Sequence, residues 1–155
     1  MVNNKITLYN ATTNMAVKLR HLLIADSVLL DSITGKASAI GLFDVINIEP
    51  NQPSRIASFS ILGQLVFDEL PTTQTSVLVV LKSPDGEPVK EGVPLTLEPP
   101  SQDTATPLHI PFVVNFSGIE INQIGNYEVE ITVDGFTPEA QEVGTFQAVK
   151  LNTPT

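Results

Sequence analysis

The sequence predicts an all-β fold, a two-sheet antiparallel β-sandwich of about eight strands. Apolar and polar residues alternate over several short stretches, as they do in strands that bury one face. Twelve prolines and nine glycines are spread along the chain and separate these stretches. No stretch shows the sustained apolar period of about 3.6 residues that an amphipathic helix requires.

Two long strands are expected early in the chain, over residues 19–30 and 36–48. Residues 31–35 join them, with Thr34-Gly35 at the reversal, and Asn51-Gln52-Pro53 ends the second strand. The first strand contains the most hydrophobic stretch, Leu22–Leu30, which is too short and too polar to span a bilayer.

Three later stretches alternate strictly, and each predicts a strand with one face in the core. Proline cannot donate to a ladder, so Pro111 places its strand at an edge or faces away. Asp134-Gly135 is a turn pair of the hairpin type. The residues expected to face the core are Phe59, Ile61, Leu65 and Phe67; Ile110, Phe112, Val114 and Phe116; and Tyr127, Val129, Ile131 and Val133.

Val77–Leu81 is apolar at every position, which predicts burial on both faces or a face covered by a loop or a subunit. A turn over Ser83–Gly86 and a short strand over Val93–Leu97 follow. Pro99–Pro107 has the composition of a loop. A last strand is expected over residues 143–151, and at most one short helical turn over residues 119–124.

Residues 15–151 are expected to form a single sandwich domain. Residues 1–14 are then an N-terminal extension, within which Lys5–Tyr9 suits an edge strand, and residues 152–155 are a tail.

The charge of the chain excludes some classes of partner. Eight basic residues face seventeen acidic ones, for a net charge of −9. Nucleic-acid binding depends on lysine and arginine replacing counterions, so no nucleic-acid partner is expected, and no anionic membrane surface either. The sequence has no cysteine, which excludes disulfides and thiolate chemistry. This composition fits a cytoplasmic location.

No catalytic or cofactor-binding residue is predicted, and the chain is expected not to be an enzyme. Gly35-Lys36 lacks the rest of a phosphate loop, because Leu30 and Ala37 stand where glycine and serine or threonine are needed. His21 and His109 are the only histidines, and their spacing gives no zinc site.

Carboxylates are the one abundant reactive group, and five of them fall near strand ends: Asp26, Asp31, Asp44, Asp68 and Asp85. Sandwiches can gather such residues at one tip and bind calcium through oxygen ligands. No loop has the dense Asp-x-Asp spacing of a calcium site, so turn caps are the favoured interpretation and no metal site is predicted.

Two stretches resemble known families. Gly125-Asn126-Tyr127 resembles the Gly-x-Tyr entry to the penultimate strand of immunoglobulin-like sandwiches, which implies a tyrosine that caps the corner between the sheets. Residues 18–26, Thr34–Lys36, Ile40–Asp44 and Val133–Gly135 resemble a family of short bacterial β-sandwich proteins of unknown function. That resemblance covers residues 15 to 150 and implies a fold and a bacterial origin, but no site residues.

The expected function is that of a non-catalytic binding or adaptor module, with another protein or a second copy of itself as partner. Its spare sheet edges and its loops Asp68–Ser76 and Pro99–Pro107 are the expected recognition surfaces. One alternative is a structural subunit of a homo-oligomer or larger assembly, suggested by Val77–Leu81 and Lys5–Tyr9. A further alternative is a calcium-dependent binding domain.

Overall fold

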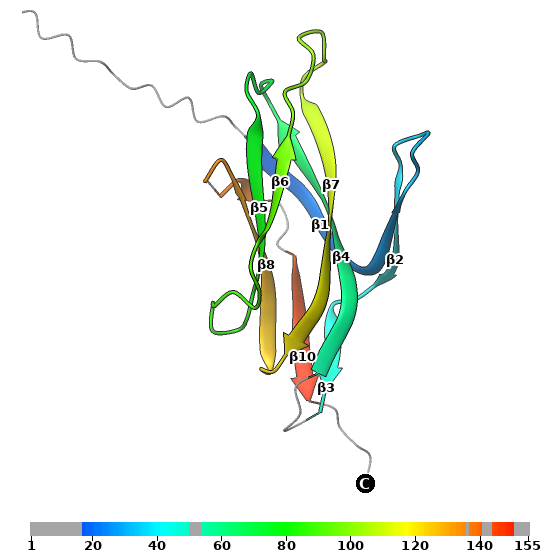
Figure 1. Cartoon of the computed structure of the whole chain (residues 1–155), viewed down its shortest axis with the longest axis vertical. Coiled ribbons are helices and arrows are strands. Elements are labelled where there is room, and N and C mark those ends of the chain that lie inside the picture. The colour runs from blue at the N-terminus through cyan, green and yellow to red at the C-terminus, as the bar shows by residue number, and fades with distance from the viewer. Residues whose placement is uncertain (1–16, 50–53, 136, 141–143, 151–155) are drawn as a thin grey trace, which may run out of the picture.

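The computed structural model describes residues 17–49, 54–135, 137–140 and 144–150, which form ten strands in two five-stranded sheets (Figure 1). The all-β prediction is confirmed, since these ranges contain no helix. They therefore hold no helical segment with the length and hydrophobicity needed to cross a membrane. No helical turn forms at residues 119–124, and β7 (Leu108–Ile121) covers the first half of that stretch.

The first sheet is built around two 14-residue strands that lie side by side over most of their length. Its order is β2 (Ala37–Leu42), β1 (Val17–Leu30), β4 (Ser54–Phe67) and β7, and β9 (Glu139–Ala140) pairs in parallel with the start of β1. Pro111 lies in β7, an edge strand, as its missing N–H requires.

The second sheet has the order β3 (Val45–Ile48), β10 (Thr145–Lys150), β8 (Gly125–Val133), β5 (Thr75–Lys82) and β6 (Val93–Leu97). Its strands are antiparallel except for β3, which pairs in parallel with β10. The expectation of a purely antiparallel sandwich therefore fails at two pairs, β3–β10 and β1–β9.

The core lies between the sheets and is formed by the alternating side chains that the sequence predicts. Phe59 on β4 stacks on Phe116 of β7, with ring centroids 5.3 Å apart. Tyr127 on β8 stacks on Phe146 of β10 at 5.0 Å. Phe59 and Phe146 meet edge-on at 6.2 Å, so aromatic contacts join the two sheets.

Residues 36–48 form two strands in different sheets, so the single long strand predicted there is wrong. β2 pairs with β1 in the first sheet, whereas β3 pairs with β10 in the second. Gly41 has φ +70°, and the Asp26 side chain occupies the space of a Cβ there. However, β2 stays beside β1, because Leu42 pairs with Ala25 and the Phe43 N–H donates to the Ile24 carbonyl (3.2 Å). Phe43 then packs edge-on against Phe59 and Phe146, which draws the chain across the end of the core.

The apolar strand β5 buries Val77, Val79 and Leu81 completely. Its other face is covered in part by the loop before β6, since a Cβ on Gly92 would meet Leu78 and Val80 at less than 3 Å. The sequence predicted either burial on both faces or a face covered by a loop or a subunit. Cover by a loop is confirmed for part of the outer face of β5.

Most of the described turns and loops lie where the sequence predicts them. Gly86 N–H donates to the Ser83 carbonyl oxygen, which closes the predicted turn, and residues 99–107 contain no strand. Asp134 and Gly135 both have positive φ, as in hairpin turns. However, the next strand, β9, pairs with β1 and not with β8, so this turn makes no hairpin. The expectations for residues 1–14, 51–53 and 152–155 lie outside the described residues.

Candidate docking surface

Of the five aspartates near strand ends, Asp26 lies within β1, and the other four lie in separate turns or loops. Asp68 pairs with Lys18 (Nζ to Oδ2, 3.0 Å), and the Asp26 carboxyl group lies against Gly41. Asp31 and Asp85 each accept hydrogen bonds from their own turn. Among the described residues no three acidic or histidine side chains gather as metal ligands do. These carboxylates therefore act locally, as caps and pairs.

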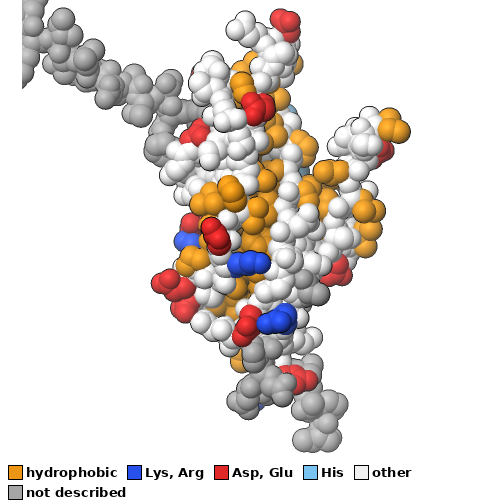
Figure 2. Space-filling model, in the orientation of Figure 1, with side chains coloured by type: hydrophobic (Ala, Val, Ile, Leu, Met, Phe, Trp, Pro, Cys, Tyr) orange, Lys and Arg blue, Asp and Glu red, His pale blue; other side chains and the backbone are white. Residues whose placement is uncertain are grey.

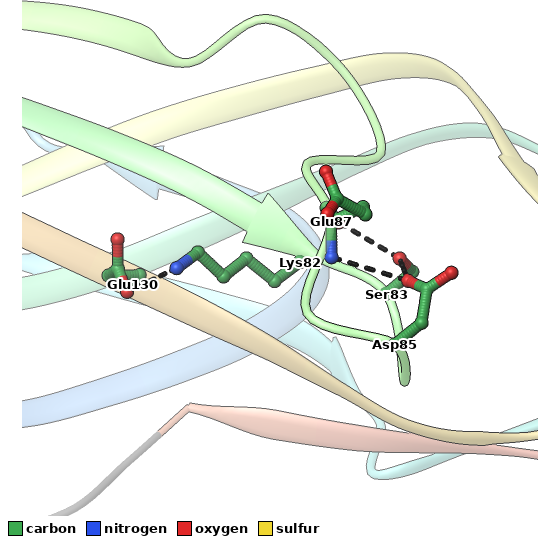
Figure 3. Close-up of polar contacts among 5 residues, drawn as sticks. All are labelled: Lys82, Ser83, Asp85, Glu87 and Glu130. Carbon is green, nitrogen blue, oxygen red and sulfur yellow. Dashed lines mark hydrogen bonds and ion pairs between the residues drawn. The ribbon is translucent and has the colours of Figure 1, made fainter.

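Asp85 organises the loop after β5 (Figure 3). Its carboxylate accepts hydrogen bonds from the Ser83 hydroxyl, from Gln123 Nε2 at 2.9 Å and from the Glu87 amide at 3.2 Å. These bonds, that from Ser83 foremost, lower the pKa of Asp85 to about 2. Beside the loop, Lys82 Nζ lies 2.6 Å from Glu130 Oε2 on β8. The cluster closes the turn after β5 beside the second sheet.

The two histidines lie near each other on the outer face of the first sheet, which their spacing in the sequence did not indicate. His21 is the register partner of Gln64, and His109 Nδ1 lies 3.5 Å from Gln64 Oε1. Gln64 thus stands between them as a neutral neighbour. Zinc requires three or four ligands, and the described residues supply no third one here.

The strongest functional feature is a hairpin that leaves the first sheet. β1 pairs with β4 only as far as Ala25, opposite Ser60. Beyond Ala25 it pairs with β2 alone, to the last pair Leu30–Ala37. We call residues 26–42 the arm. Figure 1 shows it standing apart from both sheets at the right of the view.

The arm is apolar on both faces. One face presents Leu29, Ile40 and Leu42, which are 59%, 52% and 60% exposed. The other presents Leu30, which is 56% exposed, with Val28, Ala37 and Ala39 beside it. Six of the eight large hydrophobic side chains exposed in the described ranges fall between residues 29 and 45, so they form a cluster (Figure 2). Such clustering marks a surface for docking.

The tip of the arm is a rigid turn with an apolar residue at its end. Asp31 accepts hydrogen bonds from the Ile33 amide (2.8 Å) and the Thr34 hydroxyl (2.7 Å), and Gly35 N–H donates to the Asp31 carbonyl. The Thr34 hydroxyl is the main cause that lowers the pKa of Asp31. The turn holds Ile33 outward with 92% of its surface exposed. This confirms Gly35-Lys36 as part of a hairpin turn.

An open cleft of about 320 Å³ lies where the arm joins the body. It is lined by three consecutive residues of β1, by the end of β2 and by the start of β10: Leu22, Leu23, Ile24, Leu42, Phe43, Asp44, Gly144 and Thr145. Most of these side chains are apolar, and Asp44 is the one carboxylate among them. The cleft therefore adjoins the exposed apolar surface of the arm at Leu42.

Sequence reasoning located the two strands of the arm but missed that their outer halves have no third strand. The available signal was the consecutive apolar run Val28-Leu29-Leu30 opposite Ala37–Leu42, because a strand with one solvent face would alternate there. The predicted recognition loops, in contrast, hold no such cluster in the described ranges.

The fold and this surface define an all-β protein of two sheets that carries a projecting apolar hairpin. The chain belongs to DUF6941, a family of unknown function whose model matches residues 20–142. No curated protein is similar to it in sequence.

Among solved structures, the chain is similar to the alkylpurine DNA glycosylase AlkC of Pseudomonas fluorescens, determined with DNA containing an abasic site analog. The identity is 12% and the TM-score 0.45, over 88% of this chain and 31% of that one. This chain thus spans about a third of the length of the glycosylase.

Proposed function

We propose that the protein is a non-catalytic binding or adaptor module and that the arm is its binding surface. The observation that carries this proposal is the exposure of apolar side chains on both faces of a two-stranded ribbon. An isolated two-stranded hairpin is marginally stable in water, whereas added strands or a packed face stabilise it. A partner protein that covers the arm would supply the added strand or the packed face that this hairpin lacks.

The proposal that the chain is not an enzyme is supported by how its reactive groups are used. Asp31 and Asp85 close their own turns, and Lys82 pairs with Glu130. Asp44 is the one carboxylate among the residues that line the cleft, and it is exposed. Because no three acidic or histidine side chains of the described residues gather as metal ligands do, we do not propose calcium binding.

We also propose that the architecture is a variant of the immunoglobulin-like sandwich, and that the protein is bacterial and cytoplasmic. The first point is supported by Tyr127, whose hydroxyl group bonds to the backbone four residues upstream, as a corner tyrosine does. The location is supported by the lack of cysteine, which fits a reducing compartment.

The proposal is tested by capturing partners on the immobilised full chain. The arm variant carries Leu29→Ser, Ile33→Ser and Ile40→Ser. The control carries Leu78→Ser and Ile124→Ser, which change exposed apolar residues outside the arm. A partner identified by mass spectrometry and rebound as purified protein should bind the wild type and the control alike, and bind the arm variant at least about tenfold more weakly. Equal binding to the arm variant would contradict the proposal.

A further inference from the structure

The outer edge of β2 is unpaired in the described structure and lacks the usual protection. Natural proteins guard edges with charge, proline, bulges or short length. β7 contains Pro111, β6 is short and contains Pro94, and β3 has four residues. The stretch of β4 that β1 leaves unpaired contains Arg55. From Ala37 to Ile40, β2 has no charge, no proline and no positive φ.

The charges at the two ends of β2 are opposite. Lys36 directly precedes the strand, and Asp44 follows it by two residues, with no charge between them. Both are exposed, and neither belongs to an ion pair, which in the described ranges are Lys18–Asp68 and Lys82–Glu130. Asp31, near the Lys36 end, is turned into its own loop by the hydrogen bonds from Ile33 and Thr34.

A strand with this polarity is complementary to itself in the antiparallel direction. When two copies of β2 pair about a twofold axis near Ala39, Lys36 of each copy comes close to Asp44 of the other, opposite or one diagonal away. Both contacts form at once, because a twofold interface uses the same residues on each side. Parallel pairing would instead set like charges side by side.

Pairing also joins the apolar surfaces of the two arms. It converts two ribbons of two strands into one sheet with the order β1-β2-β2-β1, and more than two strands are what an independent sheet needs. Ile40 of each copy then lies beside the axis, on the face that carries Leu29 and Leu42. Pairing gives the open N–H and C=O groups of both β2 strands partners, and the apolar faces of the two arms become one continuous face.

We infer that the partner of the arm is a second copy of this chain, bound through antiparallel pairing of the two β2 strands with reciprocal Lys36–Asp44 contacts. The inference rests on the proposed function and names its partner. It concerns the edge of the arm and Asp44, which lines the cleft where the arm joins the body.

The test is sedimentation velocity of the full chain and of charge variants. The wild type should be dimeric at about 100 μM. Lys36→Glu and Asp44→Lys should each weaken the dimer at least about tenfold, because each sets like charges together twice. A 1:1 mixture of the two variants should recover the wild-type dimer, since the introduced glutamate of one copy then meets the introduced lysine of the other, and the native Asp44 and Lys36 also meet. Misfolding of either variant would not be repaired by mixing.

Two further variants complete the test. Lys90→Glu makes the same charge change in the loop before β6 and should dimerise as the wild type does. Ala39→Pro places a proline in the paired edge and should leave the chain monomeric. A monomeric wild type at about 100 μM, or single charge variants that dimerise normally, would overturn the inference. In that case a different purified partner that binds the wild type but not the arm variant would still support the proposed function.

Discussion

The hydroxyl group of Tyr127 closes a ring with the backbone of Gln123. It accepts a hydrogen bond from the Gln123 amide at 3.2 Å and donates one to the Gln123 carbonyl at 3.1 Å. The ring of Tyr127 is fully buried and stacks on Phe146 at 5.0 Å. One side chain therefore fixes the entry to β8 and also fills the core between the sheets.

Tyr127→Phe separates these two roles. It keeps the stacked ring but leaves the Gln123 amide and carbonyl without their partner, so the free energy of unfolding should fall by about 1–3 kcal/mol. Tyr127→Ala also creates a cavity and should cost about 3–5 kcal/mol. Urea unfolding followed by circular dichroism measures both. A Phe variant as stable as the wild type would show that water replaces these bonds without loss.

Gly63 is required by the ring that lies over it. A Cβ at this position would be 2.2 Å from Cζ of Phe112, on the neighbouring strand. Gly63→Ala should therefore displace the Phe112 ring and destabilise the chain by about 1–3 kcal/mol. The double variant Gly63→Ala, Phe112→Leu frees that space, so its two effects should not add. Additive losses, measured by urea unfolding, would contradict a steric cause.

Asp85 makes part of the stability depend on pH. Its pKa is lowered from 3.8 to about 2 in the folded chain, so it stabilises the fold above pH 3.8 and this contribution is lost as the pH falls toward 2. Asp85→Asn keeps an acceptor oxygen but cannot be protonated in that range. The melting temperature of Asp85→Asn should therefore decline less steeply between pH 4 and 2 than that of the wild type.

The matched control for Asp85 is Asp103→Asn, which makes the same charge change in the loop between β6 and β7. Its acid profile should follow the wild type. If Asp85→Asn also follows the wild type across pH 4 to 2, the hydrogen bonds from Ser83, Gln123 and Glu87 do not stabilise the folded carboxylate.

The ion pair between Lys82 and Glu130 should contribute only modestly to the free energy of unfolding. The two side chains are 30% and 39% exposed, so water screens much of their attraction. A double-mutant cycle with Lys82→Met and Glu130→Gln should give a coupling of about 0.5–1 kcal/mol that shrinks in high salt. A coupling that does not respond to salt would indicate packing of the Lys82 stem instead of charge.

The alternation of apolar and polar residues predicted most of the core but little of the strand topology. Phe59, Tyr127 and Ile131 are buried as their alternation requires, because the side-chain period of a strand is local. The division of residues 36–48 between two sheets goes with the packing of Phe43 against Phe59 and Phe146, which is a long-range effect. Local alternation carries no information about which strands become neighbours.

The docking surface was harder to predict than the core. Ala25 is fully buried and pairs with both Ser60 and Leu42, whereas the next residue, Asp26, has already left β4. The apolar run Val28-Leu29-Leu30 is a signal, but it does not locate this departure, because apolar residues fill a buried strand and an exposed arm alike. Exposure of Leu29 and Ile33 is a property of the assembled sheets.

Hydrogen exchange at the amides of Ala37–Ile40 tests the central claim most directly, because half of a strand's N–H groups point toward its open edge. If the arm docks on a second copy, exchange in this segment should be slow in concentrated protein and speed up on dilution, and it should be fast at every concentration in Lys36→Glu. Fast exchange in the wild type at all concentrations, with no partner protein able to slow it, would contradict the arm as a docking surface.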